Sequence, residues 1–133
     1  MKIINLGEKN SLLNRYIAEI RDVVIQKDSM RFRRNLERIG EIFAYEISKT
    51  LTYSPKEVET PLGIANCNLS NDKIVLSTIL RAGLPLHQGL LNYFDKAENS
   101  FIAAYRKYGK DNKFSIQLEY ASTPSVENKI VII

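Results

Sequence analysis

Two short segments of the chain carry side chains suited to binding a phosphorylated ligand. The first is Arg81-Ala82-Gly83, where an arginine at the end of an apolar run is followed by two small residues. A guanidinium forms paired hydrogen bonds to phosphate oxygens, and a glycine lets a ligand approach the backbone. Amide groups at the start of a helix beginning near Leu84 would add to an anion site. The alternative for this segment is a surface salt bridge beside an ordinary turn glycine.

The second segment is Tyr105-Arg106-Lys107-Tyr108-Gly109-Lys110, which combines basic residues with hydroxyl-bearing aromatic ones. Such side chains contact phosphates or stack on bases, and the alternative is a solvated loop. Each segment follows a stretch that we predict to be a buried strand. Because open parallel sheets bind ligands beyond the carboxyl ends of their strands, both segments would face one crevice.

Hydrophobic periodicity predicts two helices and a hairpin in the first half of the chain. Apolar residues recur at three- and four-residue intervals from Ser11 to Gln26, and again from Phe32 to about Leu51. Ser11 is a suitable N-cap for the first helix. From Lys56 to Asn68, β-branched residues flank a Pro61-Leu62-Gly63 turn signal, which predicts a short hairpin.

The second half of the chain has the pattern of an α/β domain with a parallel sheet. The apolar run from Lys73 to Leu80 predicts a strand buried on both faces, followed by a helix from about Leu84 to Phe94. A second strand is expected over Ser100 to Tyr105, after a connection long enough for a parallel crossover. A polar hairpin or mobile flap should span Arg106 to Asn128, before a third strand from Lys129 to Ile133.

Composition excludes several classes of protein and site. With 133 residues, 44% of them hydrophobic, the chain matches one globular domain that needs no disulfide or metal to fold. No apolar run approaches the roughly 20 residues of a membrane-spanning helix. The first residues lack the apolar core of a secretory signal, so we expect a cytoplasmic protein. The net charge of +4 favours anionic partners such as phosphorylated metabolites.

Single residues add little chemistry of their own. Cys67 is the only cysteine and His87 the only histidine, so neither can belong to a cysteine or histidine metal cluster. We expect His87 to be an ordinary helix residue and Cys67 to have a packing role. The cluster Arg31-Phe32-Arg33-Arg34 resembles a nucleic-acid surface, but Glu37 and Glu41 share its helix. A solvated helix face is therefore favoured, and a nucleic-acid partner is not expected.

Taken together, the ordered segments resemble uracil phosphoribosyltransferases. The run Ile79-Leu80-Arg81-Ala82-Gly83-Leu84, followed by Gly89-Leu90-Leu91, carries the resemblance most specifically. Further matches in the same order are Arg31-Phe32-Arg33 with Gly40 and Tyr45-Glu46, then Tyr105-Arg106, and the strand Lys129 to Ile133. The resemblance covers essentially the whole chain and implies a phosphoribosyltransferase-like parallel sheet with flanking helices and a β-hairpin arm.

The resemblance also implies an activity in pyrimidine salvage. Members of this family transfer ribose 5-phosphate from phosphoribosyl pyrophosphate (PRPP) to uracil, with Mg²⁺, forming UMP and releasing pyrophosphate. Arg81 and Arg106 fall on the two family arginines that contact PRPP, while Ala82 and Gly83 fall on its pyrophosphate-binding loop. Family members assemble as dimers or tetramers with the help of the arm, and GTP activates some of them. No nucleophilic side chain is required.

By this resemblance the 133 residues form a single domain that is incomplete at its C-terminus. Residues 1–52 would be the N-terminal helices, 53–70 the arm, and 73–133 the start of the sheet, with a flexible hairpin at about 107–128. The family loop Asp-Pro-Met-Leu-Ala-Thr-Gly should begin just after Ile133, and it is absent together with the uracil-binding segment. We therefore expect this chain alone to be inactive, and to associate through uncovered apolar surface.

One departure and two alternative functions stay open. Gln88 occupies a position where the family usually has an acidic residue, which would alter the charge near the diphosphate. One alternative is a non-catalytic protein of the same fold that binds a nucleotide or RNA as a regulator. The other is a short assembly module in which the helices and the arm serve only in association.

Overall fold

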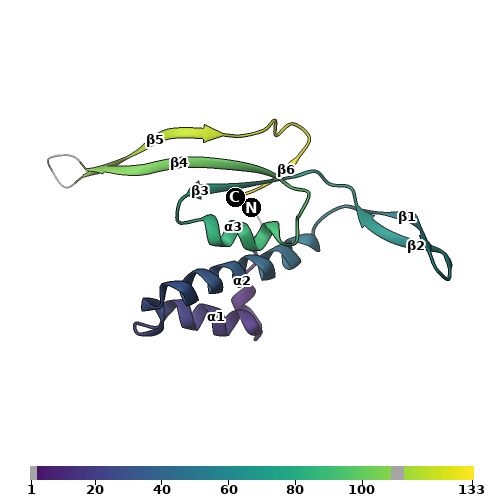
Figure 1. Cartoon of the computed structure of the whole chain (residues 1–133), viewed down its shortest axis with the longest axis horizontal. Coiled ribbons are helices and arrows are strands. Elements are labelled where there is room, and N and C mark those ends of the chain that lie inside the picture. The colour runs from purple at the N-terminus through teal and green to yellow at the C-terminus, as the bar shows by residue number, and fades with distance from the viewer. Residues whose placement is uncertain (1–2, 109–112) are drawn as a thin grey trace.

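The computed structural model describes residues 3–108 and 113–133. Three layers are stacked in it: a sheet, then helix α3 (Leu84–Leu91), then helices α2 (Ser29–Ser48) and α1 (Leu12–Arg21) (Figure 1). Short 3-10 turns cover Leu6–Glu8 and Ile25–Lys27. Among the described helices, none has the length and apolar character needed to cross a membrane.

Side-chain caps set the ends of the first two helices. The Asp22 carboxylate accepts hydrogen bonds from the backbone N–H groups of Val24 (2.8 Å) and Ile25 (2.9 Å), which ends α1 at Arg21. Asp28 caps α2 in the same way, so this helix begins at Ser29. The first helix is therefore shorter than the predicted Ser11 to Gln26, because local side-chain hydrogen bonds compete with helix propagation.

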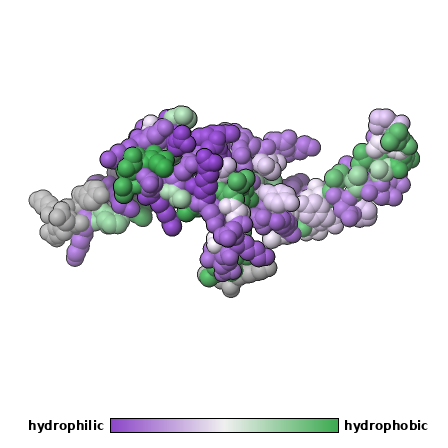
Figure 2. All heavy atoms as spheres, turned by 90° about the horizontal axis from the view of Figure 1, so that it is seen from below, coloured by the Kyte–Doolittle hydropathy of each residue, from purple (hydrophilic) through white to green (hydrophobic). Residues whose placement is uncertain are grey.

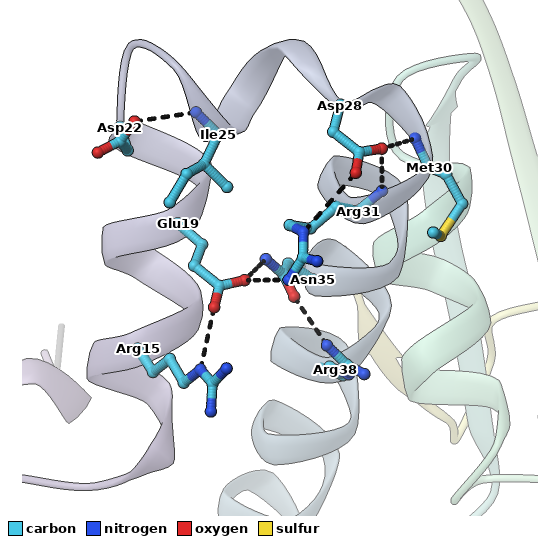
Figure 3. A network of polar contacts seen from close by, with 9 residues as sticks. All are labelled: Arg15, Glu19, Asp22, Ile25, Asp28, Met30, Arg31, Asn35 and Arg38. Carbon is cyan, nitrogen blue, oxygen red and sulfur yellow. Dashed lines mark hydrogen bonds and ion pairs between the residues drawn. The ribbon is translucent and has the colours of Figure 1, made fainter.

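A polar network holds α1 against α2 (Figure 3). The completely buried Asn35 side chain donates to Glu19 Oε2 at 2.8 Å, and Arg38 donates to Asn35 Oδ1 at 3.1 Å. Arg15 approaches the other oxygen of Glu19 at 3.0 Å, while Arg31 lies 3.6 Å from Oε2. Because buried polar groups are costly without partners, this network fixes how the two helices pack.

The arm is an antiparallel hairpin of strands β1 (Tyr53–Thr60) and β2 (Gly63–Ser70), and it projects away from the rest of the chain (Figure 1). The two strands span 53–70, the range expected for the arm, and extend beyond the turn-centred hairpin of Lys56 to Asn68. Gly63 has a φ of 125°, a conformation that favours glycine at this turn. Leu62 at the tip is fully exposed.

The sheet has the order β5-β4-β3-β6 and is mixed. Strand β3 (Ile74–Leu80) pairs in parallel with both β4 (Glu98–Tyr108) and β6 (Ile130–Ile132). Strand β5 (Phe114–Ser122) runs antiparallel to β4. The predicted parallel strands are present, and α3 makes the crossover between β3 and β4.

The hairpin expected within Arg106 to Asn128 is confirmed, since the end of β4 pairs antiparallel with β5. It supplies the end of β4 and all of β5, so β4 extends beyond the predicted Ser100 to Tyr105. Residues 109–112, within the expected flexible hairpin of about 107–128, lie outside the described residues. The main core lies between sheet and helices, where the fully buried Leu76 packs with Ala44 of α2 and Leu90 of α3.

Candidate functional site

Arg81, Ala82 and Gly83 form a tight turn between β3 and α3. The backbone N–H of Gly83 donates to the carbonyl of Ile79 at 3.1 Å, and that of Leu84 donates to the carbonyl of Arg81 at 3.2 Å. The peptide bond between Leu80 and Arg81 is cis. The turn places the N-terminus of α3, with its partial positive charge, directly after the arginine.

Gly83 is the residue that allows the turn to close. A Cβ atom at this position would lie only 2.1 Å from Thr78 Oγ1 and 3.0 Å from the carbonyl oxygen of Ile79. Any other residue would therefore force the backbone of the turn away from β3. The glycine recognised in the sequence is required here by close approach, since its own φ of −74° is accessible to all residues.

Arg81 is exposed at this turn and has no carboxylate within ion-pair distance among the described residues. A surface salt bridge, the alternative considered from the sequence, is thus not formed in the part of the chain that the structure describes. The guanidinium stands next to a helix N-terminus with its donors available, an arrangement that suits a phosphate or diphosphate group.

Arg106 lies at the same edge of the sheet. Leu80 pairs with Ala103, so Arg81 is level with Ala104, and Arg106 follows two residues further along β4. The Arg106 guanidinium carbon lies 5.0 Å from the centre of the Phe114 ring of β5, within the range of a cation–π contact. Like Arg81, it is exposed and forms no ion pair within residues 3–108 and 113–133.

The face of the sheet on which Arg106 lies follows from its position in β4. Side chains alternate along β4, so Arg106 shares the face of Ser100, whereas Phe101 packs against His87 of α3 on the other face. Because Arg81 follows β3 directly, a ligand that contacts both guanidinium groups would lie at the carboxyl end of β3, close to the turn. This is the place that parallel sheets generally offer to a ligand.

Two residues of α3 next to the turn are held by contacts with amide side chains. His87, expected to be an ordinary helix residue, is buried, and its Nε2 lies 2.7 Å from Asn99 Oδ1 of β4. The neutral Gln88 is exposed and donates to Asn92 Oδ1 at 2.9 Å, so no acidic side chain stands at this departure from the family pattern. Both side chains line a groove of about 670 Å³ between α2, α3 and β4.

Two charged residues of α2 form an ion pair along this groove, as expected for a solvated helix face. Arg34 lies 2.7 Å from Glu37, and this contact lowers the pKa of the Glu37 carboxyl and raises that of Arg34. A larger cavity of about 1060 Å³ lies between the N-terminal segment, α1 and α2, lined mainly by apolar side chains. It contains none of the four candidate site residues.

Thr78 is the neighbour of the turn that the sequence did not single out. It is a hydroxyl residue within the apolar run of β3, five positions before Gly83, and only its contact with that glycine reveals its place. Among the described residues there is no group of three or more His, Cys, Asp or Glu side chains that could hold a metal ion. Cys67 lies apart from the turn, on strand β2 of the arm.

Comparison with known proteins decides the family. The family model described as uracil phosphoribosyltransferase matches residues 8–133, nearly the entire chain. The chain belongs to the uracil phosphoribosyltransferase family. Its α/β fold with a mixed sheet and flanking helices agrees with the architecture expected from this resemblance.

Individual relatives extend the match. The uracil phosphoribosyltransferase of Porphyromonas gingivalis is 56% identical over 133 residues, which are 100% of this chain and 62% of the relative. That of Methanothermobacter thermautotrophicus is 39% identical over 108 residues, 80% of this chain and 49% of the relative. The chain thus spans about three-fifths or less of the length of these relatives.

A solved structure shares the fold. The AQ2163 protein of Aquifex aeolicus superposes with a TM-score of 0.75 at 28% sequence identity, covering 92% of this chain and 57% of that protein. The shared fold therefore extends over most of this chain.

Proposed function

We propose that this protein is a uracil phosphoribosyltransferase of pyrimidine salvage, and that the Arg81–Gly83 turn binds the diphosphate of PRPP. The observation that carries the proposal is the unpaired Arg81 guanidinium in a turn closed by Gly83, at the sheet edge that also holds Arg106. The family match supports uracil and PRPP as the substrates.

The proposed chemistry needs positive charge more than a nucleophile. As the bond between C1 of the ribose and the diphosphate breaks, negative charge accumulates on the departing oxygens. Arginines that already face these oxygens stabilise the transition state without reorganising. In this proposal, Arg81 and the amide groups of Ala82 and Gly83 bind the diphosphate, and Arg106 contacts PRPP from the neighbouring strand.

Magnesium enters this proposal as part of the substrate. The four candidate residues contribute guanidinium and backbone groups and no carboxylate, so their chemistry does not fit a resident Mg²⁺ site. We propose that Mg²⁺ arrives bound to PRPP, as family resemblance suggests. Activation by GTP stays a prediction from the same resemblance.

We also propose that the protein is a cytoplasmic homo-oligomer in which the arm contacts a second copy. The arm projects from the rest of the chain, and hydrophobic atoms gather at its end (Figure 2). Leu62 is fully exposed there and Ile64 is 72% exposed. Exposed apolar side chains on a projecting hairpin are typical of a surface covered by a partner.

The test is an assay of UMP formation from uracil and Mg–PRPP, using the protein as its gene encodes it. We expect turnover by the wild type and a loss of at least about a hundredfold in kcat/KM for PRPP in Arg81→Ala, because a bidentate charged contact is lost. Arg21→Ala is the matched control, since Arg21 is an exposed arginine on the outermost helix. Absence of UMP formation by the wild type would refute the proposal.

A further inference from the structure

Thr78 lies beneath the candidate diphosphate-binding turn. Its side chain points to the α3 side of the sheet, where β3 pairs Thr78 with Phe101. The residue is 93% buried, with only 7% of its surface exposed. A Cβ built on Gly83 would lie 2.1 Å from Thr78 Oγ1 and 3.5 Å from Thr78 Cβ. The hydroxyl, rather than the methyl group, therefore occupies the space beside the glycine.

The Thr78 hydroxyl faces the turn, in contrast to the hydroxyl groups of its neighbours. Ser77, the preceding residue, points to the opposite face of the sheet and contacts Ser100 Oγ at 3.2 Å. Ser100 in turn lies 2.8 Å from Thr123 Oγ1. The hydroxyl groups of Ser77, Ser100 and Thr123 therefore contact one another, and of these four only that of Thr78 is directed at Gly83.

An oxygen atom suits this close approach better than carbon. A Cα–H group can donate a weak hydrogen bond to an oxygen at about 3.3–3.6 Å. A methyl carbon in the same place prefers about 3.5–4.0 Å and gains no such bond. Replacing the hydroxyl by a methyl group would therefore move Gly83 away from β3, together with the backbone that follows Arg81.

We propose that Thr78 is a positioning residue. Its hydroxyl sets the distance between Gly83 and β3, and so positions the Arg81–Gly83 backbone for diphosphate binding. The inference rests on the proposed function of the turn. Thr78 acts through Gly83 and need not touch the reacting atoms. This role predicts that the affinity for a diphosphate depends on the Thr78 hydroxyl, whereas the KM for uracil does not.

The test compares Thr78→Val, which keeps the shape but loses the hydroxyl, with Thr78→Ser, which keeps the hydroxyl. Inorganic pyrophosphate is titrated calorimetrically into the protein as its gene encodes it. We expect Thr78→Val to bind about tenfold more weakly, and Thr78→Ser to stay within about threefold of the wild type. The KM for PRPP should follow the same order, with the KM for uracil unchanged. Ser77→Ala is the matched control, because that hydroxyl faces away from the turn.

The outcomes separate this inference from the proposed function. If the wild type binds no pyrophosphate, if Thr78→Val binds as tightly as the wild type, or if Thr78→Ser is as impaired as Thr78→Val, the positioning role is wrong. If the wild type binds pyrophosphate but forms no UMP, the proposed enzyme fails, while the titration still decides the role of Thr78. A circular dichroism spectrum of each variant reports whether it folds.

Discussion

Gly40 of α2 and Gly89 of α3 bring two helix backbones into direct contact. A Cβ atom on Gly40 would lie 3.1 Å from the Cα of Gly89 and 2.3 Å from the carbonyl oxygen of Leu86. A Cβ atom on Gly89 would lie 2.0 Å from the carbonyl oxygen of Glu37. Because α3 begins at the candidate turn, this contact fixes the position of the turn relative to α2.

The first prediction concerns Gly89→Ala. In an isolated helix this change stabilises by about 1 kcal/mol, but here the added methyl group overlaps the backbone of α2. We expect the free energy of unfolding to fall by about 1–3 kcal/mol, as for other overpacked sites. Urea unfolding measures it, with Gln88→Ala as the control on the exposed side of α3. An increase in stability in Gly89→Ala would contradict the close packing.

Some parts of this fold follow from local sequence and others do not. The strand β3 and the Arg81–Gly83 turn were predictable, because each depends on a few adjacent residues. Burial of β3 on both faces is confirmed at Val75 and Leu76 but is wrong at its end, where Ile79 is 54% exposed. The end of α1 was not predictable, since Val23 and Val24 continue the apolar periodicity, yet they are 71% and 70% exposed. The Asp22 cap decides that boundary.

Contacts between distant residues account for most of what the sequence missed. The pairing of β5 with β4 decides between the expected hairpin and the expected flap, and the alternation of apolar and polar residues from Phe114 to Tyr120 was a local sign of strand that the prediction did not use. The approach of Thr78 to Gly83 depends on how the turn folds back over β3. Likewise, the hydrogen bond from Asn35 to Glu19 spans 16 positions and belongs to no periodic pattern.

The second prediction is a pH dependence that originates in Glu19 (Figure 3). Hydrogen bonds from Asn35 and then Arg15 lower the pKa of this carboxyl below its ordinary 4.5. A lowered folded pKa means that the stabilisation is complete above the unfolded value and is lost as the pH falls through the folded value. The wild type should therefore lose its stability advantage over Glu19→Gln as the pH falls from about 6 to about 3.

Chemical denaturation at several pH values measures this advantage. Glu59→Gln is the control, because Glu59 lies on the exposed arm and forms no ion pair within the described part of the chain. Its difference from the wild type should not change in this range. If the difference for Glu19→Gln were equally constant, the network around Asn35 would not depend on the charge of Glu19.

The third prediction tests the arm as a contact between copies. The apolar side chain of Leu62 is not buried within one chain, since the residue is fully exposed. We expect Leu62→Asp to weaken self-association at least about tenfold, because burying an unpaired charge is unfavourable. Sedimentation velocity over a concentration series measures this. Val24→Asp is the control, a similarly exposed apolar position on the turn between α1 and α2. Equal association of both variants with the wild type would show that the arm tip is not at an interface.

The last prediction separates two contributions of Arg106. Its guanidinium offers paired donors to PRPP and also lies over the Phe114 ring, which restrains its direction. Arg106→Lys keeps the charge but loses the planar fork, so we expect the KM for PRPP to rise about tenfold. Phe114→Leu keeps the guanidinium and removes the aromatic face, and a contact of about 0.5–1 kcal/mol predicts a rise of about two- to fivefold.

Lys107→Ala is the control for both variants, since side chains alternate along β4 and Lys107 therefore leaves the sheet on the face opposite Arg106. Steady-state kinetics with PRPP varied at saturating uracil distinguish the cases. If Arg106→Lys behaves like the wild type, Arg106 supplies only a point charge to the sheet edge. If Phe114→Leu is as impaired as Arg106→Lys, the ring does more than orient the guanidinium, and the antiparallel strand β5 then belongs to the site itself.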